Sequence, residues 1–467
     1  MDFYLKPERI SGLTDAERVQ LARLLKVFND HHAKNAEKNR YYEGNIPLSK
    51  VNLGIALPEG MKGLEIGCAW GQKTVDVLAA LSMFDGYVGE NGEDLEELEQ
   101  IVEGNNLVTQ YMTAARDELK FGCTFATLSA DPEIGCKIRF HSPQTASALW
   151  DGYAGRISCG FAIIDFDRDP ATPTEYAPSV INLYTDDAVV VLRRADREWY
   201  AERHAHKMGR PLMEPLVWNA TSDKPFGRSR IKEPIRRLIQ GYVRTIANAT
   251  IGLEFATSPQ KYLLGVTDEQ YEAVVNQKFR QYVGAILTST TNPETGDKPT
   301  FGQLAQGNIS PHVEMIRVLA TQFSAASGLT VADTGVVNDA NPTSSEALIA
   351  QSRTLIGMAE QLNSGNGNAL RTIALMALAV SRNVTLADLT AEETDVVAHF
   401  KNPAMPSVAV TADAAIKIAS ARASFAETDT FLEMIGFSQA DIRRIKSQEQ
   451  RVRGRSILDQ LAEVVTE

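Results

Sequence analysis

Residues 310–361 indicate a helix, a loop and a longer helix; they read SPHVEMIRVLATQFSAASGLTVADTGVVNDANPTSSEALIAQSRTLIGMAEQ. Ser310 and Pro311 are typical of a helix start, because a hydroxyl caps free N–H groups and proline loses no hydrogen bond at the first helical position. Apolar residues follow at helical spacing, and Gly328 stands where a glycine commonly ends a helix. The sequence therefore predicts a helix over 310–328.

The segment after this helix, residues 329–342, contains Asp333 and Asp339 and no basic residue. Thr343 and Glu346 then form the pattern of a capping box, which opens a second helix with one apolar face. We expect an acidic loop between two well-specified helices. Loops that rigid helices present usually contact another molecule.

The residues NPTSSEAL, 341–348, resemble the signature NPSSAEAL that opens the long helix of portal proteins of tailed bacteriophages. Those proteins form the ring at one capsid vertex through which double-stranded DNA enters and leaves. Further segments are similar to portal motifs and follow in portal order: YYEG at 41–44, HSP at 141–143, LYTDD at 183–187, GRPLMEPLVWN at 209–219 and PFGRSRI at 225–231.

The resemblance covers about residues 40–385 and implies an α+β portal fold with a wing, a two-helix stem, a small α/β clip and a helical crown. The boundaries that it implies are 1–227 for the wing, with N-terminal helices before a β-rich part, 228–255 for the first stem helix, 256–309 for the clip, 310–328 for the second stem helix, 329–342 for the tunnel loop, 343–402 for the long helix and the rest of the wing, and 403–467 for the crown.

By the same resemblance, the tunnel loop projects into the DNA channel. Its expected channel residues are Asp333, Thr334, Gly335, Val336, Val337, Asn338 and Asp339. A basic run around the start of the first stem helix could contact DNA phosphates or an acidic neighbouring subunit, although a solvated face or pairing between subunits fits it as well. The candidates are Arg228, Arg230, Lys232, Arg236 and Arg237.

Local patterns predict several more elements. A helix is expected over 13–40, and an interruption or kink of the long helix near Ser364–Gly367. Alternating or β-branched segments predict strands at 138–141, 158–165, 180–184, 188–193 and 199–203. In the clip we expect a strand at 261–266, a helix at 268–282 and a strand at 286–291.

The charge of the chain narrows the class of protein. A formal net charge of −12 argues against a protein that grips nucleic acid by neutralising phosphates, but it suits one that lets DNA slide past. The four cysteines lack CxxC spacing and fit reduced, buried thiols of a cytosolic protein. The longest apolar helical run, 372–380, is about half of the ~18 residues that a membrane span needs.

The motifs of common enzymes are absent. The sequence contains no GxxxxGK[ST] phosphate loop, no GxSxG and no HExxH, so it does not encode the ATPase of a packaging motor. We predict no enzyme activity, no catalytic residue, no cofactor and no metal ligand.

Two alternatives come from other classes of protein. Residues 64–71, LEIGCAWG, look like the glycine-rich motif of S-adenosylmethionine-dependent methyltransferases. Against that reading, turn residues precede the motif and no regular alternation of strands and helices follows, as a doubly wound sheet demands. A monomeric adaptor or scaffold would share the lack of catalytic motifs but would not form a closed ring.

As a portal protein, the chain would assemble with itself into a ring of about twelve copies. The resemblance further implies double-stranded DNA passing without sequence specificity, and docking of the terminase large subunit and then of a head–tail adaptor. Major capsid and scaffolding proteins would be neighbours, and no membrane is involved. The expected location is the portal vertex of the virion, after assembly in the host cytoplasm.

Overall fold

The computed structural model describes residues 5–47, 65–89, 96–168, 176–195, 198–257, 261–264, 296, 300–303, 308–336, 345–404, 408–437, 441–442 and 444–452. The chain divides into two compact units, which we describe separately. Unit 1 comprises Met1–Glu43, Gln72–Lys232 and Asn341–Glu467, and unit 2 comprises Gly44–Gly71 and Glu233–Ala340.

Unit 1 begins with a 3₁₀ turn, η1 (Pro7–Arg9), and a long helix, α1 (Asp15–Glu43). Thr14 and Glu17 form a reciprocal cap, in which the Thr14 N–H donates to Glu17 Oε2 at 2.8 Å and the Glu17 N–H donates to Thr14 Oγ1 at 3.3 Å. The apolar stripe of α1 is buried against a β-sheet and consists of Leu21, Leu24, Leu25 and Phe28. The predicted amphipathic helix is therefore confirmed.

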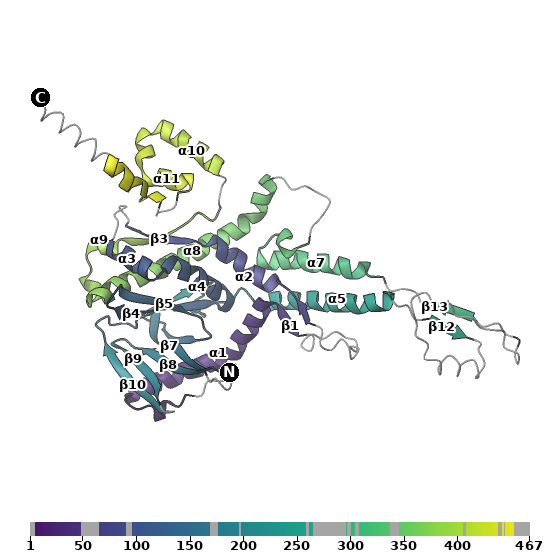
Figure 1. Cartoon of the computed structure of the whole chain (residues 1–467), viewed down its shortest axis with the longest axis horizontal. Coiled ribbons are helices and arrows are strands. Elements are labelled where there is room, and N and C mark those ends of the chain that lie inside the picture. Colours follow the sequence, from purple (N-terminus) through teal and green to yellow (C-terminus); the bar gives the residue numbers. More distant parts are fainter. Residues whose placement is uncertain are drawn as a thin grey trace. The chain divides into compact units, whose positions relative to one another are not determined.

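The β-rich part of unit 1 contains two antiparallel sheets (Figure 1). The five-stranded sheet has the order β10-β9-β8-β7-β6, with β6 (Ala146–Asp151), β7 (Arg156–Arg168), β8 (Tyr176–Tyr184), β9 (Ala188–Ala195) and β10 (Glu198–Ala205). The three-stranded sheet has the order β11-β4-β5, with β4 (Cys123–Asp131), β5 (Gly135–His141) and β11 (Met213–Val217). All five predicted strands are confirmed, within longer bounds.

Three helices pack on the three-stranded sheet and complete the core of unit 1. They are α3 (Glu96–Gly104), α4 (Leu107–Phe121) and α8 (Ser345–Arg382). Unit 1 also contains α2 (Trp70–Leu81) from Gln72 onward. Strand β3 (Phe84–Gly89) pairs antiparallel with β14 (Val396–Phe400), after η5 (Leu386–Asp388) and α9 (Ala391–Thr394). Apolar residues from α3, α4, α8 and the strands between them form one continuous core.

Of the expected interruption or kink in the long helix, the interruption is wrong, because α8 is continuous through Ser364–Gly367. The glycines and serine there lower helix propensity, but the Asn366 side chain is buried against α4 and bonded to it. Tertiary contacts thus override the local preference of four residues. The capping-box residue Thr343 lies outside the described residues.

The C-terminal part of the described chain is helical, as predicted. It contains α10 (Val408–Ala421), η6 (Ala423–Glu427) and α11 (Asp429–Ile435), and Gly436 ends α11 in the left-handed conformation with φ 104°. The ring centroids of Phe425 and Phe431 lie 5.9 Å apart and hold η6 against α11.

The described residues of unit 2 form two long helices, α5 (Glu233–Thr257) and α7 (Ser310–Ser327), and a 3₁₀ turn, η4 (Ala332–Thr334), follows α7. They also form two small antiparallel strand pairs. One joins β1 (Asn45–Pro47) to β2 (Glu65–Gly67), and the other joins β12 (Lys261–Leu264) to β13 (Thr300–Gln303). Helix α5 begins at Glu233 rather than at 228. The strand expected at 261 is confirmed, whereas the clip helix 268–282 and the strand 286–291 lie outside the described residues.

Three broader expectations can be compared with these elements. All four cysteines are buried and free, as expected. The strand of the methyltransferase-like motif, β2, pairs antiparallel with β1, and all the strand pairs among the described elements are antiparallel, so the parallel sheet of that alternative is not what this segment forms. None of the helices in the described ranges is long and apolar enough for a membrane span.

Candidate functional site

The segment with the strongest functional prediction lies in unit 2, where α5 and α7 run side by side (Figure 1). Ile239 and Val243 of α5 and Leu319 and Phe323 of α7 are buried. Gly241 allows the close approach of the helices, since a Cβ there would lie 3.1 Å from Leu319 Cδ2. The two helices therefore pack closely, and we call this pair the α5–α7 hairpin.

Trp70 joins both helices of this hairpin to the loop that follows α7. Its ring centroid lies 4.6 Å from that of Tyr242 on α5 and 4.7 Å from that of Phe323 on α7. Its Nε1–H donates to the Thr334 carbonyl oxygen at 3.1 Å. In the sequence, Trp70 stands within the methyltransferase-like motif, and nothing there predicts this role. A buried tryptophan needs a partner for its N–H, but the sequence does not reveal which one.

The end of α7 follows the prediction, whereas its start differs. Gly328 adopts φ 76°, and its N–H donates to the Ser324 carbonyl at 2.9 Å. Ser310 is the first helical residue rather than the cap, and its N–H donates to Asn308 Oδ1 at 2.9 Å. The cap is therefore supplied from two residues upstream.

The first part of the predicted tunnel loop is a folded turn. Leu329 is buried, and its carbonyl accepts a hydrogen bond from Ser324 Oγ at 2.6 Å. Asp333 Oδ2 accepts from the Thr330 N–H at 2.9 Å and from the Thr330 hydroxyl at 2.8 Å. The Asp333 carboxylate thus caps η4, so its negative charge stands at a fixed position in the segment.

The remaining expected channel residues divide into two groups. Gly335 closes η4 with φ 81°, its N–H donating to the Ala332 carbonyl at 3.0 Å, and Val336 is half-buried. The other three, Val337, Asn338 and Asp339, lie outside the described residues.

Four of the five basic candidates are at least partly accessible in the units to which they belong. Arg228 and Lys232 of unit 1 are exposed, and Arg228 Nη2 lies 3.7 Å from Asp223 Oδ2. On α5, Arg237 is exposed and forms an ion pair with Glu233 one turn earlier, while Arg236 is half-buried. An exposed pair of this kind contributes little to stability.

Arg230 differs from the expectation of a surface contact, because its side chain is buried in unit 1. Its Nε donates to the Thr74 carbonyl at 2.7 Å, its Nη1 lies 3.2 Å from Met358 Sδ, and its guanidinium lies 5.9 Å from the Trp218 ring centroid. Burial lowers the pKa of Arg230 to about 10. We therefore regard Arg230 as a structural residue that links α2 to α8.

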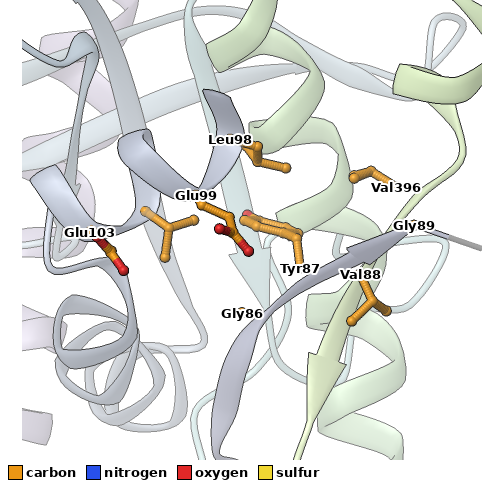
Figure 2. Close-up of a pocket in the computed structure, with 9 residues that line it drawn as sticks. Gly86, Tyr87, Val88, Gly89, Leu98, Glu99, Glu103 and Val396 are labelled. Atoms are coloured by element: carbon orange, nitrogen blue, oxygen red, sulfur yellow. The ribbon is translucent and has the colours of Figure 1, made fainter. Parts of the chain in front are cut away.

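Unit 1 contains, among other hollows, a small cavity and a wider groove. Figure 2 shows a cavity of about 30 Å³ between β3, α3 and β14, into which Tyr87 and Glu99 point while Val88 points away. That volume corresponds to about one water molecule and is too small for a cofactor. A wider polar groove of about 400 Å³ lies between α8 and β14, with Arg371 and Asp395 in its lining. Within the described ranges, no cluster of three metal-ligating side chains occurs.

Comparison with known proteins places these observations in a family. The family model described as phage portal protein, SPP1 Gp6-like, matches residues 22–454. No curated protein matches the sequence.

Several solved structures match at low sequence identity. The virion of a native gene transfer agent particle contains a chain with 12% identity and a TM-score of 0.46, covering 86% of this chain and 93% of that one. The neck of an empty particle of the same kind, computed with C6 symmetry, contains a chain with 13% identity and a TM-score of 0.44, covering 76% and 85%. The neck of the native particle, computed with C12 symmetry, contains a chain with 13% identity and a TM-score of 0.42, covering 79% of this chain and 89% of that one.

Proposed function

Because this chain belongs to the SPP1 Gp6-like family of phage portal proteins, we propose that it forms a closed ring of about twelve copies around a channel for double-stranded DNA. The family match over residues 22–454 carries this proposal. Family membership makes the chain a structural protein rather than an enzyme. The ring, its channel and its docking partners are parts of our proposal.

In this proposal, the α5–α7 hairpin is the stem and residues 329–342 are the tunnel loop. The turn at Leu329–Gly335 supports this assignment, because Trp70 and the Asp333 cap hold the base of the loop on the hairpin. A loop with a fixed base can present its remaining residues at a defined radius from the ring axis. The wing is then 1–227, the clip 256–309 and the crown 403–467, with the long helix in 343–402.

The proposed mechanism is geometric and electrostatic. Duplex DNA carries one negative charge per ~1.7 Å, and an acidic lining gives it no cation to bind. The net charge of −12 and the position of Asp333 support weak contact, so the duplex can slide in both directions. Force for packaging would come from a separate terminase docked on the clip, and a head–tail adaptor would later occupy the same end.

The basic residues near the start of the stem have two proposed roles. Arg228, Lys232, Arg236 and Arg237 remain candidates for contacts with DNA or with an acidic neighbouring subunit. Because Arg237 already pairs with Glu233, we favour subunit contacts, in which the pair can extend into a network.

Native mass spectrometry of the purified full chain, with negative-stain images, tests the proposal. We expect a single species with the mass of about twelve subunits and a central hole in end-on views. A chain that stays monomeric or dimeric even after co-expression with the capsid and scaffolding proteins of its particle would contradict the proposal.

A further inference from the structure

A chain of buried polar side chains crosses from α4 to α8 in unit 1. Glu118 and Asn366 are 0% and 1% exposed. The Asn366 Nδ2 donates to Glu118 Oε2 at 2.7 Å and to the Tyr111 hydroxyl at 2.9 Å. The Tyr111 hydroxyl lies 2.7 Å from Ser82 Oγ, which follows α2. One continuous hydrogen-bond network therefore links three segments of the core.

Two atoms of this network have no hydrogen-bond partner among the described residues, namely Glu118 Oε1 and Asn366 Oδ1. Both amide hydrogens of Asn366 are already used, and an ionised carboxylate and an amide oxygen can only accept. The network thus lacks one donor. A single proton on the Glu118 carboxyl supplies that donor, since a protonated carboxyl group donates an O–H.

The surroundings of Glu118 provide no compensating positive charge. Within the described residues, no lysine, arginine or histidine forms an ion pair with Glu118, and its titratable neighbours are the Tyr111 hydroxyl and the Cys123 thiol. The charged or titratable groups on the surrounding elements bond elsewhere: Lys38 to the Phe121 carbonyl, Lys120 to Asp117, Asp85 to Lys401, Glu97 to Arg382, His141 to Thr127, Glu214 to Arg210, and Arg371 to the Val396 carbonyl.

We propose that Glu118 is a neutral carboxylic acid at neutral pH and that its O–H bond to Asn366 makes a proton-dependent clamp between α4 and α8. Burial raises the pKa of Glu118 to about 8, and the Asn366 N–H offsets only part of that rise. The clamp lies midway along α8, so the proton affects how firmly the long helix is held. The proposal does not depend on ring formation.

The sign of the pH dependence follows from the folded and unfolded states. In the unfolded chain Glu118 returns to the ordinary pKa of 4.5, so between about 4.5 and about 8 the folded chain binds more protons. The contribution of Glu118 to stability is therefore complete below pH 4.5 and is lost as the pH rises toward 8. Above that pH Glu118 is a buried carboxylate, and both its own Oε1 and the Asn366 Oδ1 lack a hydrogen-bond donor among the described residues.

Infrared spectroscopy of the full chain, labelled with ¹³C at glutamate carboxyl groups, detects the proton directly. We expect the C=O absorption of a protonated glutamate at about pH 6 and its loss by about pH 9 in the wild type. Glu118→Gln should lack the absorption at both pH values, whereas Glu214→Gln, at a buried carboxyl group paired with Arg210, should show it at about pH 6 and lose it by about pH 9, as the wild type does. A wild type without the absorption, or a Glu118→Gln variant that keeps it, overturns the proposal.

Thermal unfolding gives a second test on the same proteins. The amide of Glu118→Gln supplies an N–H donor at every pH, so we expect its Tm to exceed that of the wild type at about pH 9 and the difference to shrink or reverse at about pH 6. If the Tm of Glu118→Gln and the Tm of the wild type change with pH in parallel, the proposed clamp is contradicted. If Glu118→Gln does not fold, the infrared titration of the wild type decides the question alone.

Discussion

Gly227 occupies a position that other residues cannot fill without movement of the backbone. Its φ is 67°, and a Cβ there would lie 2.2 Å from the Trp218 carbonyl oxygen and 2.8 Å from the Gly122 carbonyl oxygen. This glycine belongs to the segment PFGRSRI, 225–231, so the structure gives a physical reason for a glycine in that motif. The chain makes this turn after β11, the last strand of the three-stranded sheet in sequence.

We predict that Gly227→Ala destabilises unit 1 by about 3 kcal/mol, from the strained φ and the overpacked Cβ together. Gly357→Ala is the matched control, because Gly357 is an exposed glycine within α8 and a Cβ there meets no atom within 4 Å. The free energy of unfolding of the Gly357→Ala control should exceed that of the wild type by about 0.5–1 kcal/mol. Urea unfolding followed by circular dichroism measures both changes, and a Gly227→Ala protein as stable as the wild type would refute the packing described.

Trp70 contributes two separable interactions, a ring contact with two helices and a hydrogen bond to the loop. Trp70→Ala should cost about 3–5 kcal/mol, since it removes a buried aromatic ring. Trp70→Phe keeps most of the ring contact and should cost about 1 kcal/mol, through loss of the N–H donor to Thr334.

Hydrogen exchange of a peptide covering 329–336 distinguishes the two roles of Trp70. In Trp70→Phe we expect faster exchange at Thr334 and its neighbours while α5 and α7 keep their protection. Equal protection of this peptide in the variant and the wild type would mean that the indole N–H does not anchor the loop.

At the scale of elements, the α5–α7 contact depends on Gly241. Gly241→Val inserts a branched side chain where Leu319 already lies, and overpacking of this kind costs about 1–3 kcal/mol. Gly252→Ala, on the same helix with no atom within 4 Å of the added Cβ, is the control and should be near neutral. Urea midpoints measure the cost, and an unchanged Gly241→Val midpoint would show that the two helices are not held in close contact at this point.

Local sequence patterns predicted most element types and several ends. Gly328 ends α7 as expected, because a left-handed residue is a local requirement that glycine meets. The strand segments of the β-rich part were recognisable from alternation, which the pleat imposes directly. Helix starts were less predictable: Asn308 and not Ser310 satisfies the first turn of α7, and α5 begins five residues after the predicted start.

The parts that the sequence did not reveal depend on contacts between distant segments. Arg230 is one of several basic residues in a run, and nothing in the run distinguishes a buried guanidinium bonded to Thr74 from an exposed one. Similarly, Asn366 stands in a glycine- and serine-containing stretch that favours an interruption, yet its bonds to Glu118 and Tyr111 stabilise a continuous helix. Spacing along the chain encodes faces of helices and strands, not their partners.

At the scale of the whole molecule, the net charge of −12 is the property that bears on the proposed passage of DNA. Assembled protein should bind double-stranded DNA weakly, with an affinity that changes far less than the ~10³–10⁵-fold expected between 50 and 200 mM salt for a protein making 6–10 phosphate contacts. Filter binding with the purified assembly measures how the affinity for DNA changes with salt concentration. A steep loss of affinity with salt would show that basic residues grip the backbone, contrary to the sliding mechanism.

Electron cryomicroscopy of the purified ring can locate residues 329–342 in the assembly. We expect a closed ring in which these residues line the narrowest part of the channel, with Thr334 held on the α5–α7 hairpin through Trp70. A ring with this segment on its outer surface, or an open helical filament without a continuous channel, would contradict it.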